Sequence, residues 1–233
     1  MDDAGVRGLR VIDATCPLVS KVHNETKRYA RMGHEVILIG HPGHPEVEGT
    51  MGQVSAEVHL VSDIGDVATL EPSDPDKLAY VTQTTLSVDD TREIIVALKE
   101  RFPEIRGPDV KDICYATQNR QTAVRRLAER TDVILVIGAD YSSNSNRLRE
   151  ISEESGTDSY LIPDAAGMDP GWLDGARTVG ITAGASAPEE LVQELIARLD
   201  DLFEVTHADL DGIEENVTFR LPRELLDAET RVA

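Results

Sequence analysis

Two cysteines are the residues of this sequence whose type and spacing most strongly suggest chemistry. Cys16 and Cys114 are the only cysteines, and each precedes an amphipathic helix pattern and then an aliphatic run that ends in glycine. The separations from Cys16 to Gly40 and from Cys114 to Gly138 are both 24 residues. One reactive group at the same point of two matching segments predicts a shared site to which each segment contributes one thiolate.

Metal binding is the first chemistry to consider for the two thiols, because a helix N-terminus stabilises a thiolate or an anionic cluster. The alternative is that both cysteines are small buried apolar residues. A disulfide is disfavoured in a chain without a signal-peptide pattern, and structural zinc is disfavoured without a Cys-x-x-Cys pair. An iron–sulfur cluster shared between the segments would need more than two such ligands.

A second candidate is the segment of residues 40–50, which places His41, His44, Glu46 and Glu48 directly after an aliphatic run. Imidazole and carboxylate groups in a loop with Gly and Pro favour acid–base chemistry. The alternative is an ordinary helix entry, in which Pro occupies the first turn and the glutamates suit the helix dipole. Both interpretations stay open on the sequence alone.

Neutral hydrogen-bond donors occupy the matching place in the second segment. They are Ser142, Ser143, Asn144, Ser145 and Asn146. Such a run ahead of a helix suits a phosphate or diphosphate, although a Ser/Asn turn with a helix cap would account for one or two of the five. The usual nucleotide-binding loops are excluded, because no GxxxxGK and no GxGxxG pattern occurs.

Two short polar segments close the copies. Ser87 and Ser186 each stand three residues ahead of an acidic residue, which predicts a capping box at the start of each following helix. Thr84, Thr85 and Gly184 precede these positions and have no capping duty, so they are free to contact a ligand.

The elements that must position these residues form a repeat of about 98 residues that occurs twice. Aliphatic patterns predict strands over residues 10–15, 35–40, 58–62 and 78–83, and again over 109–114, 132–138, 159–163 and 178–184. Apolar spacing predicts helices over residues 19–32, 89–102, 117–130 and 188–203. Strands alternating with helices predict an α/β fold of two small parallel sheets covered on both faces.

The repeat predicts three parts of the chain. Residues 11–107 form the first α/β repeat, residues 108–203 form the second, and residues 204–233 are a C-terminal extension without a counterpart. Ligands of parallel sheets bind beyond the carboxyl ends of the strands, which is where the polar segments lie. His23 and His34, on or at the end of a helix, are interpreted as ordinary structural residues.

Composition excludes several classes of partner. The chain has 233 residues, a formal net charge of −20 and only 3 Phe, 5 Tyr and 1 Trp. This charge argues against duplex DNA and anionic membranes, and the few aromatic residues argue against base stacking. Without a signal peptide or an apolar span in the sequence, we expect a cytoplasmic protein with reduced thiols.

Seven motifs together resemble the LytB family of 4-hydroxy-3-methylbut-2-enyl diphosphate reductases along the whole chain. They are DATCPLV, ILIGHPGHPEVEGTMGQ, TQTTLSVDDT, DICYATQNRQ, SSNSNRL, GITAGASAP and EENVTFRLPREL. The resemblance implies a pseudo-threefold ring of three α/β domains around a [4Fe-4S] cluster, with one cysteine from each domain. The two repeats would be two of these three domains.

The resemblance also implies roles for particular residues. Cys16 and Cys114 would be two of the three cluster ligands, and Glu46, His44 and Thr84 would be catalytic. The allylic diphosphate substrate would be bound by His44, Thr84, Ser142, Ser143, Asn144 and Ser186. Electrons would come from a ferredoxin- or flavodoxin-like donor, and the products would be isopentenyl and dimethylallyl diphosphates.

The sequence departs from the family pattern at one point. The family's first domain, with the third cysteine ligand and two further histidines, should precede Val11, where only ten residues stand. We therefore expect a fragment, a misplaced start codon, one half of a split enzyme or a decayed copy. We also expect little or no turnover by the chain alone, and an exposed apolar face where another chain would supply the domain.

Two other classes of function remain open at this stage. One is a non-catalytic diphosphate-binding or scaffold module, and the other is a two-thiol redox or metal protein.

Overall fold

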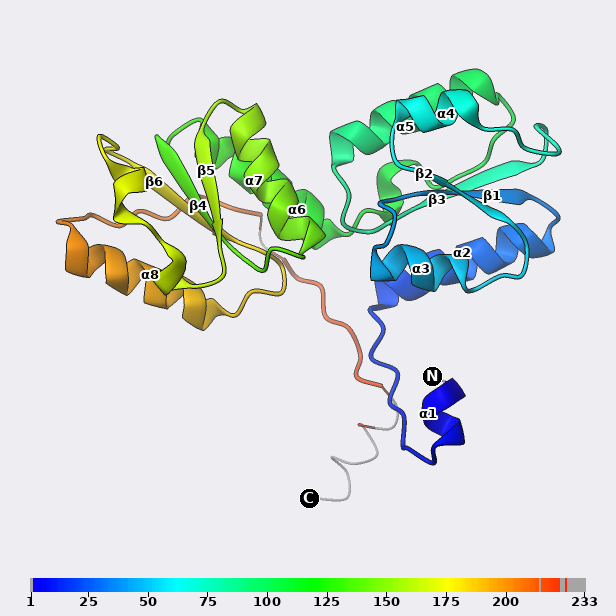
Figure 1. Cartoon of the computed structure of the whole chain (residues 1–233), viewed down its shortest axis with the longest axis horizontal. Helices are drawn as coiled ribbons and strands as arrows, with labels where there is room; N and C mark the ends of the chain where they lie inside the picture. The colour runs from blue at the N-terminus through cyan, green and yellow to red at the C-terminus, as the bar shows by residue number, and fades with distance from the viewer. Residues whose placement is uncertain (1, 214, 223–224, 226–233) are drawn as a thin grey trace.

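The computed structural model describes residues 2–213, 215–222 and 225, and most of them form two α/β units that lie side by side (Figure 1). The first unit contains α2 (Pro17–Arg31), β1 (Glu35–Ile39), α3 (Pro45–Met51), β2 (Val58–Val61), α4 (Ile64–Thr69), β3 (Leu78–Thr82) and α5 (Val88–Arg101). The second unit contains α6 (Tyr115–Ala128), β4 (Val133–Ile137), α7 (Ser143–Glu154), β5 (Asp158–Ile162), β6 (Val179–Ala183) and α8 (Glu189–Leu202). A short helix α1 (Asp2–Val6) and the 3-10 helices η1 (Asp109–Asp112), η2 (Ala165–Gly167) and η3 (Pro170–Leu173) complete the described elements.

The two units have the same topology. Each contains a three-stranded parallel sheet, in the order β2-β1-β3 in the first unit and β5-β4-β6 in the second. A helix precedes the central strand of each sheet, and another helix connects it to the first edge strand. The predicted fold class, two repeated α/β units with small parallel sheets, is therefore confirmed.

Helices cover both faces of each sheet, as the continuous aliphatic strands require. Alternate β1 side chains point to opposite faces, so Val36 and Leu38 pack with α2 and α3 while Ile37 and Ile39 pack with α4 and α5. The second sheet packs in the same way between α6 and α7 on one face and α8 with the 3-10 helices on the other. Figure 1 shows the α6 and α7 side of the second unit turned toward the first.

Two predicted strands do not form. Residues 10–15 have no regular structure and are exposed, because no neighbouring strand accepts their backbone groups. Residues 109–114 begin with the 3-10 helix η1 instead, after Arg106 has paired with β3. Pro108 has no N–H to continue this pairing, and Asp109 adopts a positive φ of 56°, which turns the chain away from the sheet.

The units meet where the turn after β3, residues 83–87 and here named the β3 turn, packs on α6. The buried Gln121 amide binds backbone groups at the end of this turn. Its Nε2 donates to the carbonyl oxygen of Leu86 at 2.8 Å, and its Oε1 accepts from the N–H of Val88 at 3.1 Å. A single side chain on the second unit thereby satisfies backbone groups of the first unit.

Charged side chains border the same junction. Arg147 of α7 donates to Ser87 Oγ at 2.9 Å and lies 3.4 Å from the Asp90 carboxylate. On the other side, Lys21 of α2 lies 2.9 Å from Asp112, whose side chain is fully buried. The Thr82 N–H of β3 also donates to this carboxylate, so Lys21 and β3 together hold η1 against the first unit.

The segment after α8 leaves the second unit and crosses α6. Glu215 accepts from Asn119 at 3.0 Å and lies 3.8 Å from Arg120. Figure 1 shows this extension and the segment before α2 projecting to the same side of the molecule. The predicted limits 11–107, 108–203 and 204–233 stay a prediction, and residues 214, 223–224 and 226–233 lie outside the described residues.

No helix within the described residues is long and apolar enough to cross a membrane.

Replacing Gln121 with Leu tests the junction. The change leaves the Leu86 carbonyl and the Val88 N–H without their side-chain partner, which should lower the free energy of unfolding by about 1–3 kcal/mol. Urea unfolding monitored by circular dichroism measures the effect. As a control, Gln193→Leu on the exposed side of α8 should change the free energy of unfolding by less than about 0.5 kcal/mol. Equal effects of the two substitutions would contradict the proposed importance of Gln121.

Candidate functional site

The β3 turn joins three of the predicted site residues through Thr84. The Thr84 N–H donates to Glu46 Oε1 at 2.8 Å, and its hydroxyl donates to Glu46 Oε2 at 3.0 Å. The carbonyl oxygen of Thr84 accepts from the N–H of Cys114 at 2.9 Å. Thr84 thus links the carboxylate carried by α3 to the cysteine at the start of α6.

The loop after β1 positions Glu46 and His44 together. His44 is the N-cap of α3, and its Nδ1 accepts from the Glu46 N–H at 3.2 Å. Burial raises the pKa of Glu46, although its two bonds from Thr84 act in the opposite direction. Burial and the nearby His41 lower the pKa of His44, so its ring is neutral with Nδ1 as acceptor and Nε2 as donor. A buried carboxyl with a raised pKa therefore lies beside a neutral imidazole.

Both cysteines lie at helix N-termini, although the strands predicted ahead of them are absent. Cys16 is the N-cap of α2 and is exposed. Cys114 is the N-cap of α6, where its Sγ lies 3.3 Å from the Thr117 N–H and 3.0 Å from the Thr117 hydroxyl. The thiols therefore occupy equivalent positions, each at the positive end of a helix dipole.

Most of the polar run after β4 has structural partners. Ser142 caps α7 by accepting from the N–H of Ser145 at 3.3 Å, and Asn146 donates to the Ser142 carbonyl at 3.0 Å. Ser143 lies 3.4 Å from the Thr85 hydroxyl. The cap and turn alternative thus accounts for most of the run, and Ser143 connects it to the β3 turn.

Asn144 is the exception within this run. It is 6% exposed, yet neither its amide nitrogen nor its amide oxygen has a hydrogen-bond partner among the described residues. A buried amide without partners costs free energy, so such a group indicates a place where a ligand binds. Gly184 lies beside it, and a Cβ at Gly184 would lie 3.7 Å from Asn144 Nδ2 and would overlap Ser145 Oγ.

Ser186 does not cap the following helix, so the predicted capping box at this position is wrong. The N-cap of α8 is Pro188, which has no side chain able to accept a backbone N–H. The corresponding prediction for Ser87 is confirmed, because Ser87 Oγ accepts from the Asp90 N–H at 3.2 Å. Proline two residues after Ser186 moves the helix start away from it and leaves an exposed hydroxyl.

The repeat relates the two halves of this site position by position. Counting from the glycine that ends each central strand, Asn144 occupies the place of Glu46. Thr84 follows Thr82 by two residues, and Gly184 follows Thr182 by two residues, so Gly184 occupies the place of Thr84. Thr84 supplies two donors to Glu46, whereas Gly184 has no side chain to offer Asn144. The same scaffold therefore holds a satisfied carboxylate in one unit and an unpaired amide in the other.

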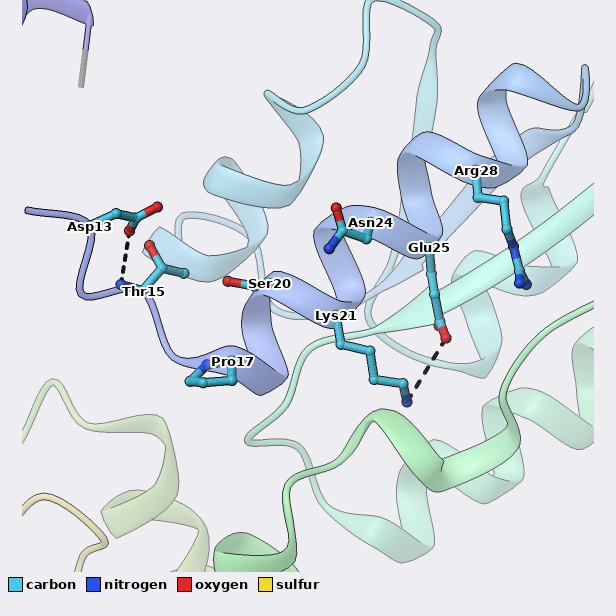
Figure 2. A pocket seen from close by; sticks show the side chains of 8 residues that line it. All are labelled: Asp13, Thr15, Pro17, Ser20, Lys21, Asn24, Glu25 and Arg28. Carbon is cyan, nitrogen blue, oxygen red and sulfur yellow. Dashed lines mark hydrogen bonds and ion pairs between the residues drawn. The ribbon is translucent and has the colours of Figure 1, made fainter. Parts of the chain in front are cut away.

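Two hollows border the site. A cleft of about 490 Å³ lies between the units and is lined by His41, His44, Thr85, Ser87, Tyr141, Ser143, Asn146 and Arg147, among others. A second hollow of about 630 Å³ lies between the segment before Cys16 and α2. Figure 2 shows Asp13 and Thr15 beside Ser20, while Lys21 and Glu25 extend along another side of the helix.

Sequence reasoning did not identify the residues that hold the site together across the junction. Gln121 lies on the buried side of α6 with Thr117 and Val124. A glutamine at a helix position whose spacing predicts burial was the signal in the sequence that could have identified it. Arg147 gave no such signal, because its partners in the first unit, Ser87 and Asp90, are distant in sequence. The individual roles of the predicted site residues stay a prediction.

Comparison with known proteins gives the family. The model of the family described as LytB protein matches residues 1–200. The chain belongs to the LytB family.

Members of the LytB family with curated names are similar to nearly the whole chain. The 4-hydroxy-3-methylbut-2-enyl diphosphate reductase of Azoarcus sp. (strain BH72) is 59% identical over 227 residues, which are 97% of this chain and 73% of that protein. The 4-hydroxy-3-methylbut-2-enyl diphosphate reductase 1 of Rhodopseudomonas palustris is 60% identical over 229 residues, with 97% and 74% covered. The chain thus spans about three quarters of the length of these relatives.

A solved LytB-family structure has the same fold. The E-1-hydroxy-2-methyl-but-2-enyl-4-diphosphate reductase from Plasmodium falciparum superposes with a TM-score of 0.93 at 36% identity. The match covers 99% of this chain and 73% of the other. Because the match extends over both units, their relative arrangement is shared with that structure.

Glu46→Gln tests the electrostatics of the site through stability. Since the folded state raises the pKa of Glu46, it binds this proton more tightly than the unfolded chain does. The ionised carboxylate therefore lowers stability above its folded pKa, and this loss disappears as pH falls through that pKa toward 4.5. Gln should raise the melting temperature at pH 7 and leave it unchanged near pH 4. A lower melting temperature at pH 7 would contradict this sign.

Proposed function

We propose that this chain provides the site for the reductive dehydroxylation of 4-hydroxy-3-methylbut-2-enyl diphosphate. The observation that carries the proposal is the β3 turn, which holds the Glu46 carboxyl and the Cys114 backbone on the two sides of Thr84. Membership of the LytB family and the printed names of its relatives support the choice of substrate. In this reaction the allylic C–O bond breaks, two electrons and two protons enter, and water leaves.

The residues of the chain have separate duties in this proposal. Glu46 holds a proton and delivers it, with the Thr84 hydroxyl 3.0 Å away, to the departing hydroxyl group. Neutral His44 donates from Nε2 to the substrate. A diphosphate would accept hydrogen bonds from Asn144 and Ser186, with Ser142 and Ser143 beside them at the start of α7. Since the amide of Asn144 has no described partner, binding the anion would satisfy it.

Cys16 and Cys114 fit an iron–sulfur cluster by their chemistry and position. Each thiol lies at a helix N-terminus, and the Cys114 sulfur already accepts from the Thr117 N–H. When bound, such a cluster supplies electrons one at a time and a Lewis acid for the allylic oxygen. No group of three or more His, Cys, Asp or Glu side chains among the described residues is placed to hold a metal. A third ligand from outside the two units completes the proposed set.

The remaining parts of the proposal concern the surroundings of the enzyme. The electron donor is a ferredoxin- or flavodoxin-like protein, and the location is cytoplasmic. The products are isopentenyl and dimethylallyl diphosphates, which places the reaction in isoprenoid biosynthesis.

The test of this function uses a chimera in which the part of the Azoarcus relative outside the match is joined ahead of Met1. After anaerobic reconstitution with iron and sulfide, the chimera should oxidise reduced viologen only when the allylic diphosphate is added. Glu46→Gln should lower the turnover number by about 10²-fold or more, as expected for loss of a general acid. An iron-loaded chimera without substrate-dependent oxidation would contradict the proposed function.

Asn144→Leu separates binding from stability. The substitution removes an amide that has no described partner, so the free energy of unfolding should stay unchanged or rise. Affinity for the allylic diphosphate, measured by calorimetric titration of the reconstituted chimera, should fall at least tenfold. Asn146→Leu is the matched control, because Asn146 donates to the carbonyls of Asp140 and Ser142 and its loss should lower stability. Undiminished affinity in Asn144→Leu would remove Asn144 from the site.

A non-catalytic diphosphate-binding module gives a different result in the same titration. Inorganic diphosphate would then bind the chain equally well after replacement of both cysteines and without iron.

A further inference from the structure

Gln83 begins the β3 turn and is the most deeply buried polar residue of that turn, with 1% of its surface exposed. Its N–H donates to the carbonyl oxygen of Ile39 at 2.8 Å, so its backbone continues the pairing of β1 and β3 by one residue. The side chain therefore starts from a fixed place at the carboxyl ends of these two strands. The proposed reaction gives this side chain no duty.

The amide of Gln83 joins three segments of the chain. Its Oε1 accepts from the His41 N–H at 3.1 Å, in the loop after β1. Its Nε2 lies 2.9 Å from Thr85 Oγ1 in the β3 turn and 3.4 Å from Ser143 Oγ in the first turn of α7. Since these segments carry candidate site residues of both units, one buried amide connects the two sides of the site.

Close packing holds this amide against the loop after β1. A Cβ at Gly40 would lie 3.3 Å from Gln83 Oε1 and 2.6 Å from Val47 Cγ2. A glycine at this position therefore lets the amide oxygen approach the backbone of the loop. The same loop leads into α3, where it places His44 and Glu46.

The orientation of the amide decides the direction of its other hydrogen bonds. A backbone N–H can only donate, so the His41 N–H must face the amide oxygen of Gln83. The amide nitrogen, which also can only donate, then faces the hydroxyl oxygens of Thr85 and Ser143. Both hydroxyl oxygens are therefore acceptors toward Gln83, and the hydrogen of each hydroxyl is left for another acceptor.

The acceptors that the protein offers these hydrogens are distant. Ser143 Oγ lies 3.4 Å from Thr85 Oγ1 and 3.5 Å from the Thr85 carbonyl oxygen, at the long end of hydrogen-bond distances. Both hydroxyls line the cleft of about 490 Å³ between the units, together with His41 and His44. An anion in this cleft would be a stronger acceptor for them than either protein oxygen.

We propose that Gln83 is a positioning residue for the diphosphate, whose amide nitrogen directs the hydroxyls of Thr85 and Ser143 to donate to that anion. Its amide oxygen at the same time holds the His41 backbone, and with it the loop that carries His44. Thr85 thereby becomes a further contact of the substrate. This inference rests on the proposed function, because it needs a diphosphate in the cleft.

Gln83→Met in the reconstituted chimera is the first test, because methionine keeps the length of the side chain and removes the amide. KM for the allylic diphosphate should rise about tenfold or more. The value of kcat should fall less than about threefold, since Thr84 still holds Glu46. Gln193→Met, on the exposed side of α8, is the control and should leave both constants within about twofold. An unchanged KM in Gln83→Met would overturn the proposal.

Gln83→Glu gives a second variant in case methionine prevents folding. Its carboxylate can still accept from the His41 N–H, but toward the two hydroxyls it accepts where the amide nitrogen donates. KM should therefore rise at least as much as in Gln83→Met. A KM within about threefold of the unaltered chimera would speak against the positioning duty.

Ser143→Ala separates positioning from a general effect on folding. If Gln83 acts through the Ser143 hydroxyl, Gln83→Met should raise KM by at most about half as many fold when residue 143 is already alanine. A purely structural duty gives the same fold increase in both backgrounds, and that result would refute the proposal.

Binding of inorganic diphosphate keeps this test separate from the proposed reaction. Calorimetric titration of the chimera needs no electron donor, and Gln83→Met should weaken the affinity about fivefold or more. If the unaltered chimera shows this difference but does not reduce the allylic substrate, the proposed reaction fails and the duty of Gln83 stands. Equal affinity of the two proteins, or no measurable binding by the unaltered chimera, would remove that duty.

Discussion

The structure depends on one constraint, which is that the turn after β3 has backbone groups that its own sheet does not bind. Those groups are bound by the second unit, through the Cys114 N–H at Thr84 and through Gln121 at Leu86 and Val88. Thr84 at the same time holds the carboxylate of Glu46. The junction between the units and the candidate site therefore share Thr84, so a substitution that disturbs the β3 turn should affect both.

The repeat shows how one scaffold acquires different chemistry in its two copies. Cys16 and Cys114 are each the N-cap of a helix, although only the Cys114 sulfur accepts from a backbone N–H. At the next pair of equivalent positions, the first unit has Glu46 with its donors on Thr84, whereas the second has Asn144 beside Gly184. A carboxyl is thus placed on one side and an amide without a described partner on the other, while the backbone stays alike.

The fold could largely be predicted from the sequence, because the strands at residues 35–39, 78–82 and 133–137 are continuous aliphatic runs of the kind that parallel sheets bury. The two segments before the cysteines misled the prediction. Their aliphatic residues at 10–15 and 109–114 have strand-like composition, but a strand also needs a neighbour with free backbone groups. Whether such a neighbour exists is decided by tertiary structure. In the second segment, the Pro108–Asp109 turn directs the chain away from the sheet, so residues 109–114 do not pair as a strand.

The site residues could be predicted where polar residues cluster in one segment of the sequence. They could not be predicted where a residue acts on a partner in the other unit. The Glu46 loop and the Ser/Asn run stand out because polar residues follow an aliphatic strand. Gln121 and Arg147 do not, since each acts across the junction on a partner at least 33 residues away. The residue types of the Ser/Asn run gave five candidates, of which the resemblance implied Ser142, Ser143 and Asn144, and the hydrogen bonds of the folded chain leave Asn144 alone of the five without a described partner.

The central claim is that the two thiols at equivalent helix N-termini are a pair of ligands for one iron–sulfur cluster. The most direct measurement is iron and acid-labile sulfide per chain, after anaerobic reconstitution of the chimera with the Azoarcus relative, for the unaltered protein and for Cys16→Ala and Cys114→Ala. The account predicts roughly four irons with matching sulfide in the unaltered protein, and a large loss of both in each variant. Iron and sulfide that remain at full content in either variant would contradict it.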